Sequence, residues 1–133
     1  MTRPELPIAL ALIWREGRLL ISRRREETHL GGFWEFPGGK IEAGESPEAA
    51  AEREAREELA VQVRAWARRA PIRYAYAERT VCLHPVDCDW IAGEPEAVQV
   101  AQWRWVAPEN LAEFDFPPAN RTLIADLAAS GGE

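Results

Sequence analysis

The fold of this chain is decided by one stretch, Gly38-Gly39-Lys40-Ile41-Glu42-Ala43-Gly44-Glu45-Ser46-Pro47, and by the alanine- and glutamate-rich residues that follow it up to Leu59. The glycines predict a loop that delivers the chain into a helix. Ser46 is a favourable N-cap, and Pro47 suits the first helical position because the N–H that it lacks has no partner there. Alanine and glutamate then favour the helix intrinsically.

Three carboxylates lie on one side of that predicted helix. Glu54, Glu57 and Glu58 stand at i, i+3 and i+4, so their side chains are neighbours. Like charges so placed destabilise a helix by about 0.2–0.5 kcal/mol per pair, and a cation between them reverses the sign. Carboxylate oxygens suit Mg²⁺ or Mn²⁺. A solvated acidic face is the competing interpretation, and for three glutamates alone it is the commoner one. Beside them runs a stripe of small and apolar residues that would pack inward: Ala51, Ala55 and Leu59.

The loop and the helix together resemble the Nudix box. The matching positions are Gly39, Glu45, Arg53, Glu54, Glu57 and Glu58. For a chain of this composition, a chance match of all six in register is on the order of one in a few thousand. Ala60 departs from the box, because it stands where glycine is usual and where a glycine would cap the helix. That departure concerns the end of the helix and not its acidic face.

Length and composition limit the possible classes of protein. The 133 residues predict one domain over residues 1–133, and a hydrophobic content of 47% supplies its core. The net charge of −6 argues against a protein that coats polymeric nucleic acid, but not against one that binds a nucleotide. Cys82 and Cys88 fit neither a zinc site nor a disulfide framework, so both are expected to be buried and reduced. Since the sequence shows no signal peptide and no long apolar run, a cytoplasmic protein without a membrane partner is expected.

The hydrophobic pattern predicts short strands, hairpins and a closing helix. Strands are expected over residues 7–14, 19–22, 61–67, 72–76, 80–90 and 102–106, the first pair and the fourth and fifth forming hairpins. Residues 97–101 are expected to form a loop, 108–113 a helical turn, 114–120 a rigid loop and 130–133 a disordered tail. The closing helix is expected from residue 119 or 120 to 129, with Leu123, Ile124 and Leu127 inward. Pro85 predicts a bulge or an edge position.

Two basic features lie close to the box. Arg23-Arg24-Arg25 follows a predicted strand, and it is either a solvated cluster or a contact for phosphate or base, since guanidinium groups match phosphate oxygens. Lys40 is the only lysine among sixteen cationic side chains. Its position is either accidental or places an ammonium beside a phosphate or a box carboxylate. His29 and His84 are isolated, and both are expected to be structural or exposed.

Beyond the box, the chain is similar to the MutT-type branch of the Nudix hydrolases, enzymes that remove oxidised guanine nucleotides, from about residue 8 to residue 127. The segments that carry the likeness are Ser22-Arg23-Arg24, Trp34-Glu35-Phe36-Pro37-Gly38-Gly39-Lys40-Ile41-Glu42, the box itself and Phe116-Pro117-Pro118-Ala119-Asn120. The last of these points to the base pocket of the branch. The resemblance implies the Nudix α/β/α sandwich, with a mixed sheet and long hairpins between helices. The residues alone support an α/β or α+β domain.

The resemblance also implies roles for single residues. The expected metal ligands are Glu54, Glu57, Glu58 and the backbone carbonyl of Gly38, and the expected substrate-binding residues are Arg24, Glu35, Lys40, Tyr76, Arg79 and Asn120. Arg53 would hold the box carboxylates in place by ion pairing. Asn120 would read the purine edge, because an amide offers both a donor and an acceptor. Tyr76 replaces a phenylalanine and keeps an aromatic face for stacking.

One further departure concerns the general base. The branch carries an additional glutamate in the loop after the long hairpin, and the register without gaps places Gln99 there. An amide is a weaker metal ligand and cannot act as a general base. Glu96 lies nearby as a substitute; otherwise the base is Glu58 or Glu45, or activation of water by the metal suffices.

The implied reaction is the attack of water on the β-phosphorus of a nucleoside triphosphate, with Mg²⁺ or Mn²⁺ as cofactor and a nucleoside monophosphate and pyrophosphate as products. No serine or cysteine has the partners of a nucleophile. Three alternatives stay open: a Nudix hydrolase of another nucleotide (CTP or another pyrimidine triphosphate, a plain deoxynucleotide or ADP-ribose), a catalytically silent module that binds a nucleotide or damaged base, and a structural domain. The partner is expected to be a small-molecule nucleotide, and the protein a monomer or a homodimer.

Overall fold

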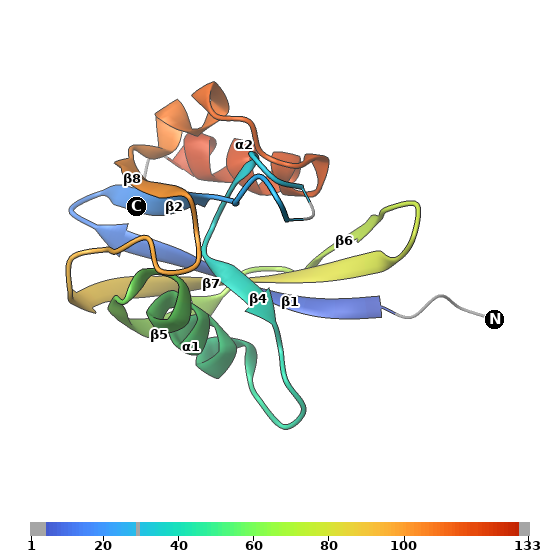
Figure 1. Ribbon diagram of the computed structural model, residues 1–133, viewed down its shortest axis with the longest axis horizontal. Coiled ribbons are helices and arrows are strands. Elements are labelled where there is room, and N and C mark those ends of the chain that lie inside the picture. The colour runs from blue at the N-terminus through green and yellow to red at the C-terminus, as the bar shows by residue number, and fades with distance from the viewer. Residues whose placement is uncertain (1–4, 29, 131–133) are drawn as a thin grey trace.

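The computed structural model describes residues 5–28 and 30–130. Its strands join in one sheet, whose central order is β3-β2-β1-β7-β5, with β4 on β1, β6 on β7 and β8 on β2 (Figure 1). The strands are β1 (Glu5–Arg15), β2 (Arg18–Arg23), β3 (Trp34–Glu35), β4 (Gly38–Lys40), β5 (Gln62–Arg68), β6 (Ile72–Ala75), β7 (Thr80–Ala92) and β8 (Gln102–Val106). β1 and β7 run parallel, from Glu5 opposite Thr80 to Trp14 opposite Asp89, and the other pairings are antiparallel. The predicted mixed sheet and its hairpins are confirmed.

Helices cover both faces of this sheet. α1 (Pro47–Leu59) lies on one face, and α2 (Arg121–Ser130) lies on the other with the 3-10 helices η1 (Pro108–Glu113) and η2 (Pro118–Asn120) (Figure 1). A separate cluster of buried apolar side chains fills the space on each side. The chain therefore forms the expected α/β/α sandwich.

The central strand β1 faces both layers. Its apolar run directs alternate side chains to opposite faces of the sheet. Ala9, Ala11 and Ile13 lie in the cluster beneath α1, whereas Leu10 and Leu12 belong to the cluster beneath α2. The strand is thus buried on both faces, as its unbroken hydrophobic pattern predicts.

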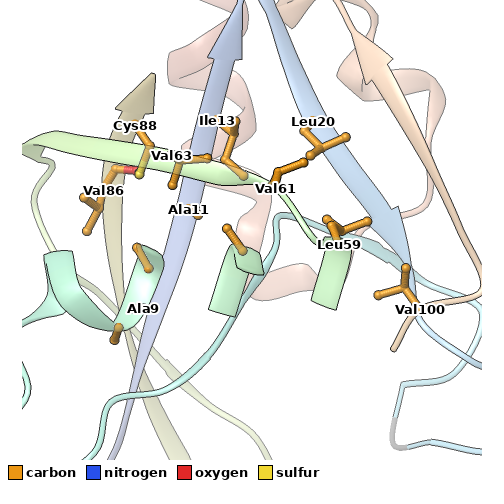
Figure 2. Close-up of a cluster of buried hydrophobic side chains, with 13 residues drawn as sticks. Ala9, Ala11, Ile13, Leu20, Leu59, Val61, Val63, Val86, Cys88 and Val100 are labelled. Carbon is orange, nitrogen blue, oxygen red and sulfur yellow. The ribbon is translucent and has the colours of Figure 1, made fainter. Parts of the chain in front are cut away.

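Small side chains bring α1 close to the sheet. Ala51 and Ala55 are fully buried, and they share a cluster with Ala9 and Ala11 of β1. Figure 2 shows branched side chains completing this cluster, Leu59 from α1 itself and Leu20, Val63 and Val86 from strands of the sheet. The close approach places the acidic side of α1 beside the edge of the sheet that carries β4.

Both ends of α1 follow from the sequence. Ser46 caps the first turn, because its hydroxyl oxygen accepts a hydrogen bond from the Ala49 N–H at 3.1 Å, and Pro47 occupies the first turn. At the other end Ala60 adopts the left-handed conformation, with φ 58° and ψ 31°, and its N–H donates to the carbonyl of Arg56 at 3.0 Å. The helix therefore ends where a glycine would end it, and the alanine bears a conformational penalty of about 1–2 kcal/mol.

Pro85 lies in the middle of the sheet, not at an edge, so the predicted edge position is wrong. On one side of β7, Leu83 is the last partner of β6 and Val86 the first partner of β5, and Pro85 falls between them. Its carbonyl accepts the Arg69 N–H at 2.9 Å. Since the N–H and C=O of a strand residue point to the same side, the missing N–H faces this gap and not β1. The register shifts in this part of the sheet lie in the β5–β7 pairing, at residues 62–63 and 65–67 of β5, and not at Pro85.

Other local predictions differ slightly from the structure. The closing helix begins at Arg121, because residues 118–120 form η2, and it reaches Ser130, which is therefore not part of a disordered tail. Residues 131–133 of that predicted tail and His29 lie outside the described residues. The short strands β3 and β4 were not expected. Cys82 and Cys88 are buried free thiols, as predicted. Across residues 5–28 and 30–130, neither helix has the length and apolarity needed to span a bilayer.

Candidate active site

Arg53 ties the loop before α1 to the helix itself. Its guanidinium donates two hydrogen bonds to Glu45, from Nε to Oε2 at 2.8 Å and from Nη2 to Oε1 at 2.9 Å. Nη1 donates to Oε2 of Glu54 at 2.9 Å and to Oε1 of Glu57 at 3.2 Å. The bonds from Arg53, and one from the Glu42 N–H, lower the pKa of Glu45 to about 2. Glu45 is therefore an anchor, with both carboxylate oxygens engaged.

A cluster of crowded carboxylates lies next to this pair, formed by Glu54 and Glu58 on α1 and by Glu35 on β3. Burial raises the pKa of Glu58 to about 9, and the nearby charges of Glu35 and Glu54 add to the rise. Burial likewise raises the pKa of Glu35, against the opposing effect of the Arg24 guanidinium. Acids whose charged forms repel one another in this way are stabilised by a cation that takes the place of a proton.

The two glycines of β4 allow backbone and carboxylates to approach closely. A Cβ on Gly39 would lie 2.5 Å from Oε2 of Glu54, and one on Gly38 would collide with the carbonyl oxygen of Ala9. The Gly38 N–H donates to Oε1 of Glu58 at 3.3 Å. Because the N–H and C=O of one strand residue point to the same side, the Gly38 carbonyl also faces α1. The structure thus explains both glycines by packing.

The donor set in this region fits a hard divalent cation. Carboxylate oxygens and a backbone carbonyl are the ligands that Mg²⁺ and Mn²⁺ prefer. Within the described residues, however, no three His, Cys, Asp or Glu side chains already converge closely enough to hold a metal ion. Glu57 is turned toward Arg53, and 47% of its side chain is exposed. Such an exposed ion pair is weak, so it is a small obstacle to a cation that attracts Glu57.

A cavity of about 670 Å³ opens beside the acidic cluster. Its apolar floor comes from β1 and β7: Leu6, Ile8, Leu10, Val81 and Leu83. Five of the expected substrate-binding residues line it: Arg24, Glu35, Tyr76, Arg79 and Asn120. An apolar floor with a few polar groups at its rim is typical of a site for a small organic ligand.

Asn120 and Tyr76 shape one wall of this cavity. Asn120 is 7% exposed and lies in η2, where the proline-rich segment before it fixes the backbone. Tyr76 packs against Tyr74 with ring centroids 4.8 Å apart, and its phenol forms a hydrogen bond with the Ala119 backbone. Burial raises the pKa of Tyr76, so its hydroxyl stays neutral. A buried amide beside an aromatic face suits a planar heterocycle.

Glu35 connects the cavity to the acidic cluster. It lines the cavity and accepts a hydrogen bond from Nη1 of Arg24 at 3.0 Å. At the same time its charge contributes to the raised pKa of Glu58. A ligand in the cavity therefore lies next to the carboxylates of α1.

Lys40 is the expected substrate-binding residue that does not line the cavity. Its side chain is exposed, and it makes no ion pair with a described residue. The backbone carbonyl of Lys40 instead accepts a hydrogen bond from Nη2 of Arg53 at 3.1 Å. The position at the loop before α1 leaves the ammonium on the solvent side of the box.

The loop that carries Gln99 and Glu96 lies against the end of α1. The Gln99 N–H donates to the carbonyl of Glu58 at 3.2 Å, and the Glu96 N–H donates to that of Leu59 at 2.8 Å. Both side chains are exposed. Position 99 therefore lies beside the turn of α1 that carries Glu58, and its side chain there is an amide.

The sequence did not lead us to expect Leu30 and Glu78 in the lining of the cavity. It also did not predict the hydrogen bond from Arg25 to the carbonyl of Val98. Leu30 sits in a polar loop with φ 59°, which no pattern in the sequence signals. Glu78 had a positional signal, since it lies between Tyr76 and Arg79 in the turn of a predicted hairpin. The contact of Arg25 joins residues 73 positions apart, which only the folded chain brings together.

A family model and several known proteins are similar to this chain in sequence. A family model described as NUDIX domain matches residues 9–126. A protein of Escherichia coli (strain K12) described as 8-oxo-dGTP diphosphatase is 35% identical over 124 residues, which cover 92% of this chain and 96% of that protein. Another from the same organism, described as CTP pyrophosphohydrolase, is 29% identical over 124 residues, covering 93% and 92%.

Solved structures agree with the architecture. The crystal structure of a MutT protein from Methanosarcina mazei Go1 superposes with a TM-score of 0.87 at 22% identity, covering 100% of this chain and 99% of that one. The solution structure of the E. coli ORF135 protein has a TM-score of 0.83 at 29% identity, covering 96% and 91%. The first likeness shows the fold alone.

Proposed function

This chain belongs to the NUDIX domain family, and on that premise we propose that it hydrolyses a nucleoside triphosphate to a nucleoside monophosphate and pyrophosphate. The observation that carries the proposal is the position of Glu35, which lines the cavity and also adjoins Glu54 and Glu58. A base bound in the cavity has its phosphate chain directed toward those carboxylates. The 35% identical relative described as a diphosphatase supports the same activity.

The metal site of the proposal is the acidic side of α1. Glu54, Glu57 and Glu58 would hold Mg²⁺, or Mn²⁺ in its place, together with the backbone carbonyl of Gly38. When bound, the ion supplies positive charge that neutralises phosphate oxygens and lowers the pKa of water. Arg53 keeps Glu54 oriented through the bond from Nη1 at 2.9 Å. The glutamates stand on a rigid helix, so little reorganisation is needed during the reaction.

Within this site we assign the proton acceptor to Glu58, whose carboxyl group would be ionised once a cation replaces its proton. Water attacks the β-phosphorus, the bond between that phosphorus and the bridging oxygen of the α-phosphate breaks, and the monophosphate leaves. Glu45 is unsuited to take the proton of the water, because Arg53 occupies both of its oxygens. Gln99 is unsuited because an amide is not a base. Among the described residues, Glu58 carries no bond from an arginine: its hydrogen bonds are a long one from the Gly38 N–H and one with the side chain of Glu54.

The preferred base in our proposal is an oxidised guanine, as in 8-oxo-dGTP. Its support is the buried amide of Asn120 in the cavity, which offers a donor and an acceptor to the edge of a purine, and the description of the 35% identical relative. Tyr76 supplies the stacking face and Arg79 a cation at the rim. Arg24 and Lys40 are assigned to the triphosphate or its neighbourhood.

A second candidate substrate is CTP. The relative described as CTP pyrophosphohydrolase covers 93% of this chain at 29% identity, and an asparagine amide also matches the edge of cytosine. The partner is a small-molecule nucleotide in either case. We propose that the chain acts as one domain, as a monomer or homodimer, in the cytoplasm where free nucleotides are found, without a polymeric nucleic acid or membrane partner.

A panel of initial rates tests the proposal. Pyrophosphate release is measured for 8-oxo-dGTP, dGTP, CTP and ADP-ribose with Mg²⁺, with Mn²⁺ and with a chelator, and the products are identified. The proposal predicts metal-dependent formation of a monophosphate and pyrophosphate, fastest with 8-oxo-dGTP. Fastest turnover of CTP selects the second candidate. Tight nucleotide binding without any pyrophosphate release would identify a silent binding module instead.

A further inference from the structure

The three consecutive arginines at the end of β2, Arg23 to Arg25, each contact a different part of the chain. Arg24 binds Glu35 at the cavity, with Nη1 3.0 Å from Oε1. Arg23 holds its own connecting segment, since Nε donates to the carbonyl of Gly32 at 3.2 Å and Nη2 to Oε2 of Glu26 at 2.9 Å. The side chain of Arg25 instead contacts a different part of the chain. Its Nη2 donates to the carbonyl of Val98 at 2.7 Å, in the connection between β7 and β8.

The segment that Arg25 reaches is held by few other contacts. It consists of four exposed residues, 96–99, between the buried Pro95 and Val100, and we call it the 96–99 loop. Its most apolar side chain, Val98, is 46% exposed and so adds little burial. The loop is therefore not fixed by a hydrophobic core, and its hydrogen bonds decide its position.

Those hydrogen bonds go to the last turn of α1. The N–H groups of Val98 and Gln99 both donate to the carbonyl of Glu58, at 3.1 and 3.2 Å, and the Glu96 N–H donates to that of Leu59 at 2.8 Å. The last carbonyls of a helix have no partner within it, so the loop supplies the donors that this end needs. The carbonyls concerned belong to the turn that carries Glu57 and Glu58.

We propose that Arg25 is a positioning residue, which clamps the 96–99 loop onto the last turn of α1 and thereby holds Glu58 in place for hydrolysis. Its action on the reaction rests on the proposed function. The bond from Arg25 is exposed, but it is short, at 2.7 Å, and charge-assisted, and such bonds are stronger than neutral ones. Arg25 does not line the cavity, so it does not contact the base. Its effect is on turnover and on the metal, through Glu58, and not on nucleotide affinity.

Amide hydrogen exchange tests the clamp without any catalysis. Exchange is measured on the metal-free protein for R25A, for R25K and for R68A as the matched control. Arg68 also makes an exposed contact with α1, but with Glu48 in its first turn. We expect R25A to speed exchange of the Val98, Gln99 and Ala60 amides about tenfold, R25K to do so less, and R68A to leave them unchanged. Unchanged exchange of these amides in R25A overturns the clamp.

Kinetics then test its consequence for the reaction. R25A is expected to lower kcat about tenfold and to raise the Mg²⁺ concentration for half-maximal rate, with the KM for nucleotide changed by less than about twofold. R25K restores part of kcat, and R68A behaves like the unmodified protein. A rise in KM with unchanged kcat, or faster exchange without a change in kcat, overturns the positioning role. If the unmodified protein hydrolyses no nucleotide, the proposed function fails, and the exchange result still decides the clamp.

Discussion

Arg53 and Glu45 are joined by two nearly equal hydrogen bonds, 2.8 Å and 2.9 Å long, across the junction between the loop and α1. The same guanidinium also bonds to Glu54 and Glu57. A single planar group thus fixes the loop and the acidic face of the helix relative to each other. This relationship explains why an arginine suits position 53 of this chain.

A lysine at position 53 should therefore not perform the function of Arg53. An ammonium has no planar fork, so R53K cannot keep both bonds to Glu45 together with those to Glu54 and Glu57. We expect kcat to fall about a hundredfold, because the carboxylates of α1 lose their orientation. The comparison is with R56K, which changes an exposed arginine on the same helix. Equal rates for the two variants would show that the Arg53 fork is dispensable.

The ion pair between Arg53 and Glu45 also predicts that the folded protein is less stable at acidic pH. Contacts with Arg53 and Glu42 lower the pKa of Glu45 to about 2 from the ordinary value of 4.5. A lowered pKa in the folded state stabilises the protein above pH 4.5, and this contribution is lost as the pH falls from 4.5 to about 2. Chemical unfolding across this range should show the loss in the unmodified protein and a shallower pH dependence in E45Q. Parallel pH profiles for both proteins would contradict the assignment.

Glu57 should be essential for turnover and dispensable for folding. Its side chain is 47% exposed and its contact with Arg53 is a surface ion pair. We expect E57Q to lose about two orders of magnitude or more in kcat under Mg²⁺, while its melting temperature stays close to that of the unmodified protein. E48Q, in the first turn of the same helix, serves as the control and should keep its activity. Activity of E57Q at the level of E48Q would count decisively against a metal site on this face.

Asn120 should determine the choice of base. Its amide is buried at the cavity wall, and a good bidentate contact to a base edge is worth about 1–3 kcal/mol of discrimination, which is about 10- to 100-fold. We expect N120A to lower the ratio of kcat/KM for 8-oxo-dGTP to that for dGTP by this factor and to leave dGTP hydrolysis largely intact. N110A removes an exposed amide from η1 and should leave the ratio unchanged. A ratio that survives in N120A assigns base recognition to other groups.

Glycine at position 60 should stabilise the protein. Ala60 is held at φ 58°, a conformation that glycine adopts without penalty. We expect A60G to raise the free energy of unfolding by about 0.5–1 kcal/mol, after allowance for the greater entropy of glycine in the unfolded chain. A49G, at an exposed site inside the helix, should lower it by a similar amount. Destabilisation by both substitutions would mean that the left-handed conformation is not strained.

Much of this fold could be predicted because its signals are local. Ser46 and Pro47 mark the start of α1 in any context, and the unbroken apolar run of β1 requires burial on both faces. The strands β3 and β4 could not be predicted, since they contain two and three residues and exist only through their pairing with β2 and β1. Pro85 lies within β7 without the loss of a backbone hydrogen bond, because the partner strands β5 and β6 meet beside it. That arrangement is a property of the whole sheet.

The site residues also divide into those whose arrangement the sequence could predict and those whose arrangement it could not. The box glutamates and Arg53 are close in sequence, so helical spacing alone brings them together. Asn120 and Glu35 had to be taken from resemblance, because their meeting in one cavity depends on the tertiary structure. The contact between Arg25 and Val98 had no signal at all in the sequence. The residue types predict which chemistry the site can perform, whereas contacts between residues far apart in the sequence determine how the site is arranged.

The most direct test is a crystal structure with Mg²⁺ and a non-hydrolysable triphosphate analogue of 8-oxo-dGTP. We expect a magnesium ion bound by Glu54, Glu57 and Glu58, in contact with the phosphates, with the base against Asn120. A complex in which these three glutamates bind no ion and the phosphates lie elsewhere would contradict it.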